Sequence, residues 1–134
     1  MSFRAEVVTP ESTVLSDEAV FVLARGLAGD VGILEGHAPM LVGLGTGKLE
    51  VHRQNGSVER FLVDGGFMEV SPNKVIVLAD VTEHESEIDL ELAKKERDRL
   101  LSLLASEESD INRRKLKMAE ARVALAEEAR ARGK

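Results

Sequence analysis

The glycine-rich residues 43–48, GLGTGK, are the part of the sequence closest to a phosphate-binding loop. Such a loop needs two glycines at a fixed spacing, then Lys and then Ser or Thr, so that backbone amides and a hydroxyl surround a phosphate. Here Val42 stands where the first glycine would be, and Leu49 follows Lys48. The segment also precedes a predicted strand, whereas a phosphate loop opens a helix. We therefore interpret it as a turn.

Other residue types that carry chemistry are scattered. His37, His52 and His84 lack the i, i+4 spacing that puts two metal ligands on one helix face. The absence of Cys excludes a disulfide framework, a thiolate zinc site and a thiol nucleophile. No Gly-x-Ser-x-Gly segment offers a serine nucleophile, and no two carboxylates are distinguished as an acid and a base. We predict a protein that is not an enzyme and that holds no metal or cofactor.

Composition narrows the class of partner. The chain has 134 residues, of which 43% are hydrophobic and 31% charged, as in soluble globular proteins. Its net charge of −6 has the wrong sign for a phosphate backbone, and four Phe are its only aromatic residues, so nucleic-acid binding is not expected. No apolar run approaches the roughly 18 residues of a membrane span, and residues 1–25 lack a signal-peptide pattern. Membrane association is therefore expected to be indirect.

Turn-forming residues divide the chain into two parts. Ten of the 11 Gly and all three Pro precede residue 75. The whole net charge of −6 belongs to residues 1–84, while the later residues are neutral overall. We place the boundary between a domain of residues 1–86 and a domain of residues 87–134.

The first part has the pattern of short strands separated by turns. Predicted strands cover residues 3–7, 20–23, 47–51, 59–63, 67–70 and 74–78. Predicted turns include Asn55-Gly56, Asp64-Gly65-Gly66 and Pro72-Asn73, whose residue types accept turn geometries. Strands about 8 to 12 residues apart predict an antiparallel β-sandwich or barrel.

The second part has helical periodicity. Apolar residues between positions 87 and 105 recur at helical spacing, and residues 106–110 offer N-cap candidates for a second helix that starts near Ile111. Two helices joined by about five residues are expected to form an antiparallel hairpin. Because its apolar stripes are thin and rich in Ala, we expect this hairpin to be marginally stable alone.

Several segments together resemble the epsilon subunits of F-type ATP synthases. They are residues 29–41 (GDVGILEGHAPML), residues 64–70 (DGGFMEV), residues 73–80, the opening residues 7–11 (VVTPE) and Ile88-Asp89. Their order and spacing also match, and the resemblance covers essentially the whole chain. It implies an N-terminal sandwich of about ten strands followed by a two-helix hairpin, in a non-catalytic subunit related to the mitochondrial delta subunit.

The resemblance implies a place in the central stalk of the rotary motor, where the sandwich binds the gamma subunit and the ring of c subunits. Asp30 matches the position that faces the c ring, and His37 and Met40 match positions near gamma. The residues alone favour a simpler interpretation, in which Asp30 is an ordinary acidic turn residue and His37 a hydrogen-bonded turn residue. Both interpretations remain open at this point.

The resemblance implies a hairpin with two positions: folded down against the sandwich, or extended along gamma toward the alpha and beta subunits, where it inhibits ATP hydrolysis. A basic cluster suited to acidic segments of those subunits comprises Arg113, Arg114, Lys115, Lys117 and Arg122. A solvated helix face is the alternative interpretation. Family members that bind ATP have an Ile/Leu-Asp-x-x-Arg-Ala motif, which Asp89 matches, but Leu92 replaces the Arg. Without that guanidinium we do not expect ATP to bind.

Two further expectations concern setting and alternatives. The resemblance implies a peripheral protein on the cytoplasmic face of a bacterial inner membrane, with a plastid thylakoid as the second setting and membrane contact only through the complex. A stand-alone sandwich-plus-hairpin adaptor is the alternative function. Copurification with gamma and the catalytic subunits distinguishes the two.

Overall fold

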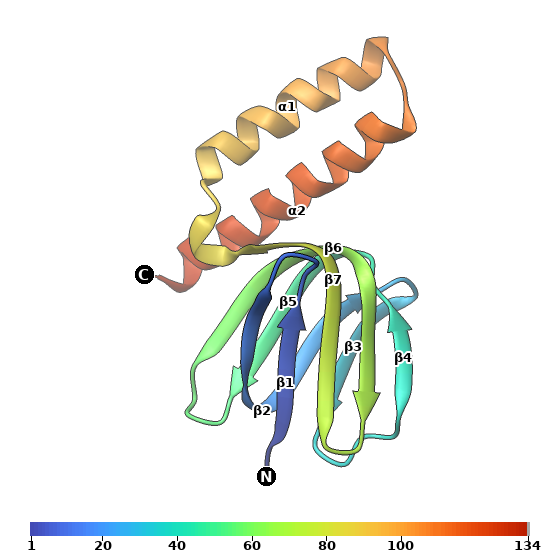
Figure 1. The fold of residues 1–134 in the computed structure, drawn as a ribbon. Coiled ribbons are helices and arrows are strands. Elements are labelled where there is room, and N and C mark those ends of the chain that lie inside the picture. The colour runs from blue at the N-terminus through green and yellow to red at the C-terminus, as the bar shows by residue number, and fades with distance from the viewer. Residues whose placement is uncertain (134) are drawn as a thin grey trace. The chain divides into compact units, whose positions relative to one another are not determined.

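The computed structural model describes residues 1–133, and the chain divides after His84 into a unit of strands and a unit of helices (Figure 1). The strands are β1 (Phe3–Val8), β2 (Thr13–Gly26), β3 (Gly29–Leu34), β4 (Met40–Gly43), β5 (Thr46–Arg53), β6 (Val58–Ser71) and β7 (Lys74–His84). The helices are a short 3-10 turn η1 (Glu85–Glu87), α1 (Leu90–Ser106) and α2 (Asp110–Arg132). The predicted sandwich and two-helix hairpin are confirmed.

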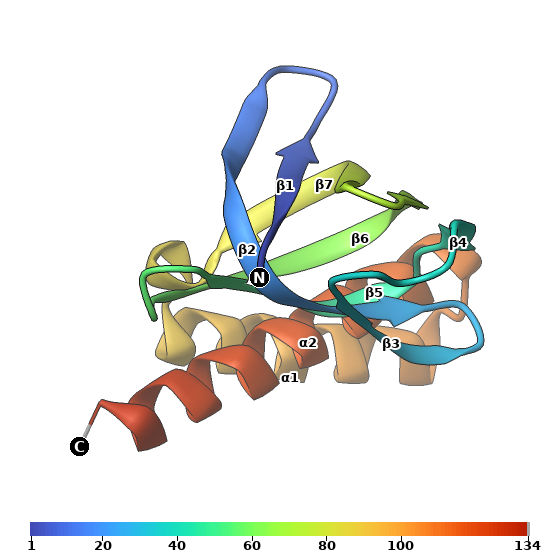
Figure 2. The same cartoon turned by 90° about the horizontal axis from the view of Figure 1, so that it is seen from below.

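The strands form two layers that share three long members. In one layer β4 pairs with the second half of β6, which pairs with β7, then β1, then the first half of β2. In the other layer β3 pairs with the second half of β2, followed by β5, the first half of β6 and the second half of β7. Figure 2 shows β2 passing from its partner β1 to its partner β3. Because β1 pairs with both β2 and β7, the sandwich closes like a flattened barrel.

The structure has seven continuous strands where about ten were expected. The difference arises because β2 and β6 each run for 14 residues and β7 for 11, long enough to serve both layers. Counting these three strands once in each layer restores the expected ten. The prediction of separate strands was therefore wrong about continuity but right about the layers.

The predicted turn at residues 64–66 is instead a corner within β6. Before it, Phe61 and Val63 point into the core, and after it Met68 and Val70 do, so the inward face changes. Gly65 and Gly66 adopt φ of +77° and +108°, which L side chains rarely adopt. A Cβ on Gly66 would lie 2.0 Å from the carbonyl oxygen of Leu78. Glycine thus lets β6 bend here against β7 without interrupting their pairing.

Alternating apolar residues of the strands fill one core between the layers. Along β1, for example, Phe3, Ala5 and Val7 are buried, as the period of two requires. The large members of this core include Phe3, Ile33, Leu49, Phe61 and Met68. All of its residues precede the helical unit, so the sandwich has a core of its own.

One carboxylate of the sandwich is buried, and its three partners are partly buried. Glu50 of β5 is 9% exposed and accepts hydrogen bonds from Arg60 Nε (2.9 Å) and His52 Nε2 (3.0 Å). Lys48 Nζ lies 3.3 Å from the same carboxylate. Burial alone would raise the pKa of Glu50, but the hydrogen bonds of His52 and Arg60 and the charge of Lys48 outweigh it and lower the pKa to about 2. The ionised carboxylate is therefore the stable form.

Replacing Arg60 is expected to destabilise the sandwich near neutral pH. The substitution Arg60→Met leaves the buried Glu50 carboxylate without one of its donors, at a cost of about 2 kcal/mol. A pKa below its unfolded value stabilises the protein above that value, so this contribution is lost as the pH falls from about 4.5 toward 2. Urea unfolding at pH 7 and pH 3 measures both effects. Arg25→Met, which removes an ion pair whose side chains are about half exposed, is the control and should cost less than about 1 kcal/mol.

The helical unit is a hairpin with a narrow core. Its two helices begin at side-chain caps: Asp89 accepts from Leu92 N, and Ser109 accepts from Asn112 N. Its buried apolar residues are few, and three of the seven are alanines: Leu90, Ala93, Leu100, Ala119, Val123, Leu125 and Ala126. Ion pairs join Arg132 to Glu85 and Arg130 to Glu91. They lie at the open end of the hairpin, where α1 begins and α2 ends.

Candidate functional site

The segment that resembles a phosphate loop connects two strands. Residues 43–48 run from the end of β4 into β5, and no helix follows them, so the interpretation as a loop without phosphate chemistry agrees with the backbone. The three histidines lie apart, in the loop before β4, on β5 and at the end of β7. Among residues 1–133 no three His, Asp or Glu side chains are arranged to hold a metal ion.

The most distinctive surface is an apolar patch on the outward side of the layer that contains β4. We call it the apolar outer face and define it as Leu27, Leu41, Phe67 and Leu78. These side chains are 79%, 68%, 53% and 46% exposed, respectively. Single exposed leucines are common on proteins, but four large side chains on one face mark a surface that binds a partner.

Strand register brings these residues together. Phe67 of β6 lies directly opposite Leu78 of β7 on one side and opposite Gly43 of β4 on the other. Leu41 precedes Gly43 by two residues, and therefore points to the same side of the sheet. Leu27 comes from the turn between β2 and β3, and its Cδ1 lies 2.8 Å from where a Cβ of Gly43 would be. Leu27, Leu41 and Phe67 thus lie around Gly43, and Leu78 adjoins Phe67 on its other side.

The predicted gamma-contact residues lie at the entry to this layer. His37 is in the loop before β4, where its N–H donates to Leu34 O (3.2 Å) and its Nδ1 lies 2.9 Å from Ala38 O. Met40 begins β4, opposite Val70, and is 37% exposed. Met40 therefore adjoins Leu41 of the apolar outer face in the chain, while His37 makes the turn hydrogen bonds that its loop position suggested.

Asp30 lies on β3, one residue beyond the turn that carries Leu27. Its Oδ1 accepts a hydrogen bond from Nε of Arg25, its partner across the strand pair, at 2.5 Å. Both side chains are about half exposed, so the pair is open to solvent and to a partner protein. The acidic group predicted to face another subunit is thus already held by a cation of its own hairpin.

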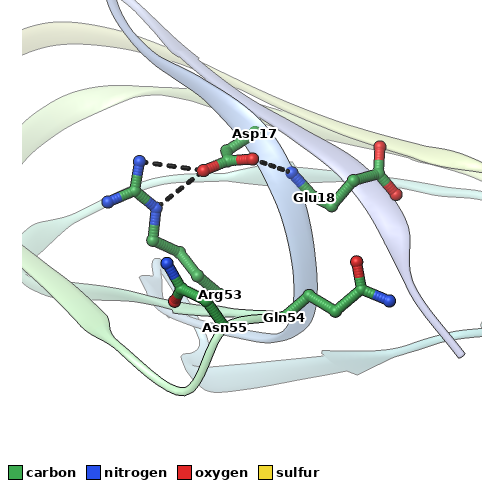
Figure 3. A pocket seen from close by; sticks show the side chains of 5 residues that line it. All are labelled: Asp17, Glu18, Arg53, Gln54 and Asn55. Atoms are coloured by element: carbon green, nitrogen blue, oxygen red, sulfur yellow. Dashed lines mark hydrogen bonds and ion pairs between the residues drawn. The ribbon is translucent and has the colours of Figure 1, made fainter.

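A polar cavity of about 270 Å³ lies at the β5–β6 end of the sandwich (Figure 3). The Asp17 carboxylate of β2 accepts one hydrogen bond from Arg53 Nε (2.9 Å) and another from the Glu18 amide (2.7 Å). The Glu18 amide, followed by the Arg53 guanidinium, lowers the pKa of Asp17 against the effect of burial. Arg53 also reaches Glu59 at 3.0 Å. These contacts tie the β5–β6 turn to β2, which is a structural role.

The predicted basic cluster of the hairpin is partly neutralised. Arg113 pairs with Glu108 (3.0 Å) and Asp110 (2.6 Å), and these carboxylates, Glu108 first, raise the pKa of its guanidinium. Arg122 and Lys115 act across the hairpin on Glu96 of α1, whose pKa is lowered mainly by the hydrogen bond from Arg99. An open cavity on α2 is lined by Arg113, Arg114, Lys117 and three neighbouring side chains. Part of the cluster's positive charge therefore interacts with carboxylates of the hairpin itself.

The comparisons with known proteins agree with the sequence and the fold. Residues 2–85 match the family model described as ATP synthase, Delta/Epsilon chain, beta-sandwich domain. The chain belongs to this family. The ATP synthase epsilon chain of Syntrophomonas wolfei is 41% identical over 118 residues, which are 88% of this chain and 86% of that one. The sodium ion specific epsilon chain of Propionigenium modestum is 35% identical over 131 residues, 95% of each chain.

Solved structures show the same fold in the family. A chain of the Euglena gracilis mitochondrial ATP synthase superposes with a TM-score of 0.77 at 19% identity, covering 99% of this chain and 82% of that one. A chain of the Tetrahymena thermophila central stalk and c ring gives 0.64 at 18% identity, over 96% of each chain. The predicted identity as an epsilon-type, non-catalytic ATP synthase subunit is confirmed. No helix within residues 1–133 is long and apolar enough to cross a membrane.

The apolar outer face was not predicted from the sequence, although one strand carries a sequence pattern that indicates it. In β7, residues 75–78 (VIVL) place apolar side chains on both faces of the strand, a pattern typical of strands covered on both sides. Leu27 gives no such signal, because its place beside Gly43 depends on how the β2–β3 turn lies against β4.

Proposed function

We propose that this chain is the central-stalk subunit of an F-type ATP synthase that couples rotation of the c ring to the gamma subunit. The observation that carries the proposal is the apolar outer face, since a rotor subunit needs a surface that stays attached under torque. A closed sandwich with one continuous core resists deformation, which suits the transmission of torque. The gamma subunit is the proposed occupant of this face, with His37 and Met40 at its border.

The c ring is proposed to meet the end of the β2–β3 hairpin, on the side where Asp30 lies. The support is its half-exposed carboxylate on a short, well-held turn, together with the match to the family position. The membrane would then be contacted only through the ring, in a peripheral location on the cytoplasmic face of a bacterial membrane.

The helical hairpin, residues 87–134, is proposed to regulate hydrolysis by reaching the alpha and beta subunits. Its thin core and solvent-exposed ion pairs are compatible with an element that changes its contacts. Arg114 and Lys117, with Arg113, Lys115 and Arg122, are the proposed contacts for acidic segments. ATP is not proposed as a ligand: Leu92 is 62% exposed and offers no donor from its side chain, and Asp89 is engaged as the N-cap of α1.

Removing residues 88–134 tests the two roles separately. The shortened chain should unfold cooperatively and restore coupled ion pumping to membranes stripped of this subunit, because residues 1–84 contain their own core. ATP hydrolysis by the reconstituted enzyme should rise about twofold or more relative to the full chain, equal to removing ~0.4 kcal/mol from the barrier. Loss of pumping with a folded fragment would contradict the coupling role, and unchanged hydrolysis would contradict the regulatory one.

A further inference from the structure

The turn between β2 and β3 is fixed onto the neighbouring strands. The Leu27 amide donates to Gly43 O at 2.9 Å, and the Gly45 amide donates to Arg25 O at 3.0 Å. Between these bonds, Gly26 forms a β-bridge with Leu44. The hairpin end therefore has a backbone connection to the segment between β4 and β5, and is not a free loop.

Because glycines of that segment have no side chain, the β2–β3 hairpin can pack closely against it. A Cβ on Gly43 would lie 2.8 Å from Leu27 Cδ1, and a Cβ on Gly47 would lie 2.8 Å from Arg25 Cβ. Ordinary side chains at these positions would displace Leu27 and Arg25. The glycine-rich segment that resembles a phosphate loop thus provides the surface on which the β2–β3 hairpin packs.

The packing of the hairpin on residues 43–47 places Leu27 beside Phe67. Gly43 is the cross-strand partner of Phe67, so a side chain lying over Gly43 borders Phe67. Leu27 is 79% exposed in that position. Burial of a leucine is favourable because its apolar surface is removed from water. A partner that covers Phe67 and Leu41 would gain this contribution from Leu27 as well.

We propose that Leu27 is a contact residue of the gamma-binding surface, and that Arg25 and Asp30 are the positioning pair that holds it there. This inference rests on the proposed function, in which gamma covers the apolar outer face. The pair lies on the two strands directly flanking the turn, so its 2.5 Å hydrogen bond closes the hairpin behind Leu27. Asp30 then acts on gamma binding through Arg25, in addition to any contact of its own.

The test measures binding to a soluble assembly of alpha, beta and gamma subunits that lacks the c ring, by titration with fluorescently labelled protein. Leu27→Ser should weaken binding about tenfold, the equivalent of ~1.4 kcal/mol of buried apolar contact. Leu34→Ser is the matched control: Leu34 is 60% exposed on β3 but lies opposite Phe21, in the other layer. It should change binding less than about twofold. Circular dichroism melting should be the same for both variants.

The positioning pair is tested in the same assay. Asp30→Asn and Arg25→Gln should each weaken binding about threefold, within the range for exposed ion pairs, and the exchange Arg25→Asp with Asp30→Arg should restore it. Unchanged binding of Asp30→Asn would overturn the positioning role and leave Asp30 as a ring contact alone. If Leu27→Ser binds normally while Phe67→Asp does not, the inference about Leu27 fails and the proposed function stands. If Phe67→Asp also binds normally, the proposed gamma surface itself is wrong.

Discussion

The variant Gly66→Ala is expected to lose more than about 4 kcal/mol of folding free energy, enough to unfold much of the protein at room temperature. The added Cβ would stand 2.0 Å from the Leu78 carbonyl oxygen and 2.9 Å from the Ala79 Cα, both backbone atoms that cannot rotate away. The positive φ adds about 1 to 2 kcal/mol of strain for any L residue. To relieve the clash, β6 would have to separate from β7 at the corner. Urea unfolding followed by circular dichroism measures the loss.

Gly56→Ala separates the two causes. Gly56 lies in the β5–β6 turn with φ of +95°, and a Cβ there would meet no atom within 4 Å. It should therefore cost only the backbone strain, about 1 kcal/mol. Equal losses for the two variants would mean that the close approach of β7 at Gly66 contributes nothing.

The corner at Gly66 also shows why sequence patterns located segments of five strands but not their continuity, while β3 and β4 were not among the predicted strands. Two glycines after Asp64 form a strong local turn signal, and the apolar residues before and after them follow opposite parities, as separate strands would. What keeps β6 unbroken is its constant register with β7, from Phe61 opposite His84 to Ser71 opposite Lys74. That register depends on residues distant in sequence. The true turns at Asn55-Gly56 and Pro72-Asn73 were predicted correctly, because each joins strands that pair with one another.

For the predicted site residues, too, the sequence indicated the local position, whereas the partners depend on tertiary contacts. Asp30 was interpreted as a turn residue because glycines flank it, but it lies on β3, and its bond with Arg25 follows from cross-strand register. Likewise, the basic residues of α2 were readable as a cluster, whereas the pairing of Arg113 with Glu108 depends on how the loop before α2 turns back. Sequence patterns identify charges, and tertiary contacts decide which of them remain available to partners.

The variant Phe67→Asp is expected to weaken binding of the gamma-containing assembly by about a hundredfold or more. Phe67 has large exposed side chains on both sides, Leu78 across β7 and Leu27 over Gly43, so it is central to the apolar outer face. Residues central to an interface, with neighbours that exclude water, contribute most to affinity. The substitution removes about 1.5 to 3 kcal/mol of apolar burial and places an unpaired carboxylate under the partner, which adds a desolvation cost. Titration with the soluble alpha, beta and gamma assembly measures the change.

The folded state should tolerate this variant, because Phe67 is 53% exposed and its side chain is outside the core. Leu34→Asp provides the matched control, since it introduces the same charge at a side chain 60% exposed on the other layer. We expect Leu34→Asp to bind within about twofold of the unmodified protein, as surface changes outside an interface do. Equal weakening by both variants would indicate that added negative charge repels gamma wherever it is placed. Only a selective loss at Phe67 supports a gamma surface composed of Leu27, Leu41, Phe67 and Leu78.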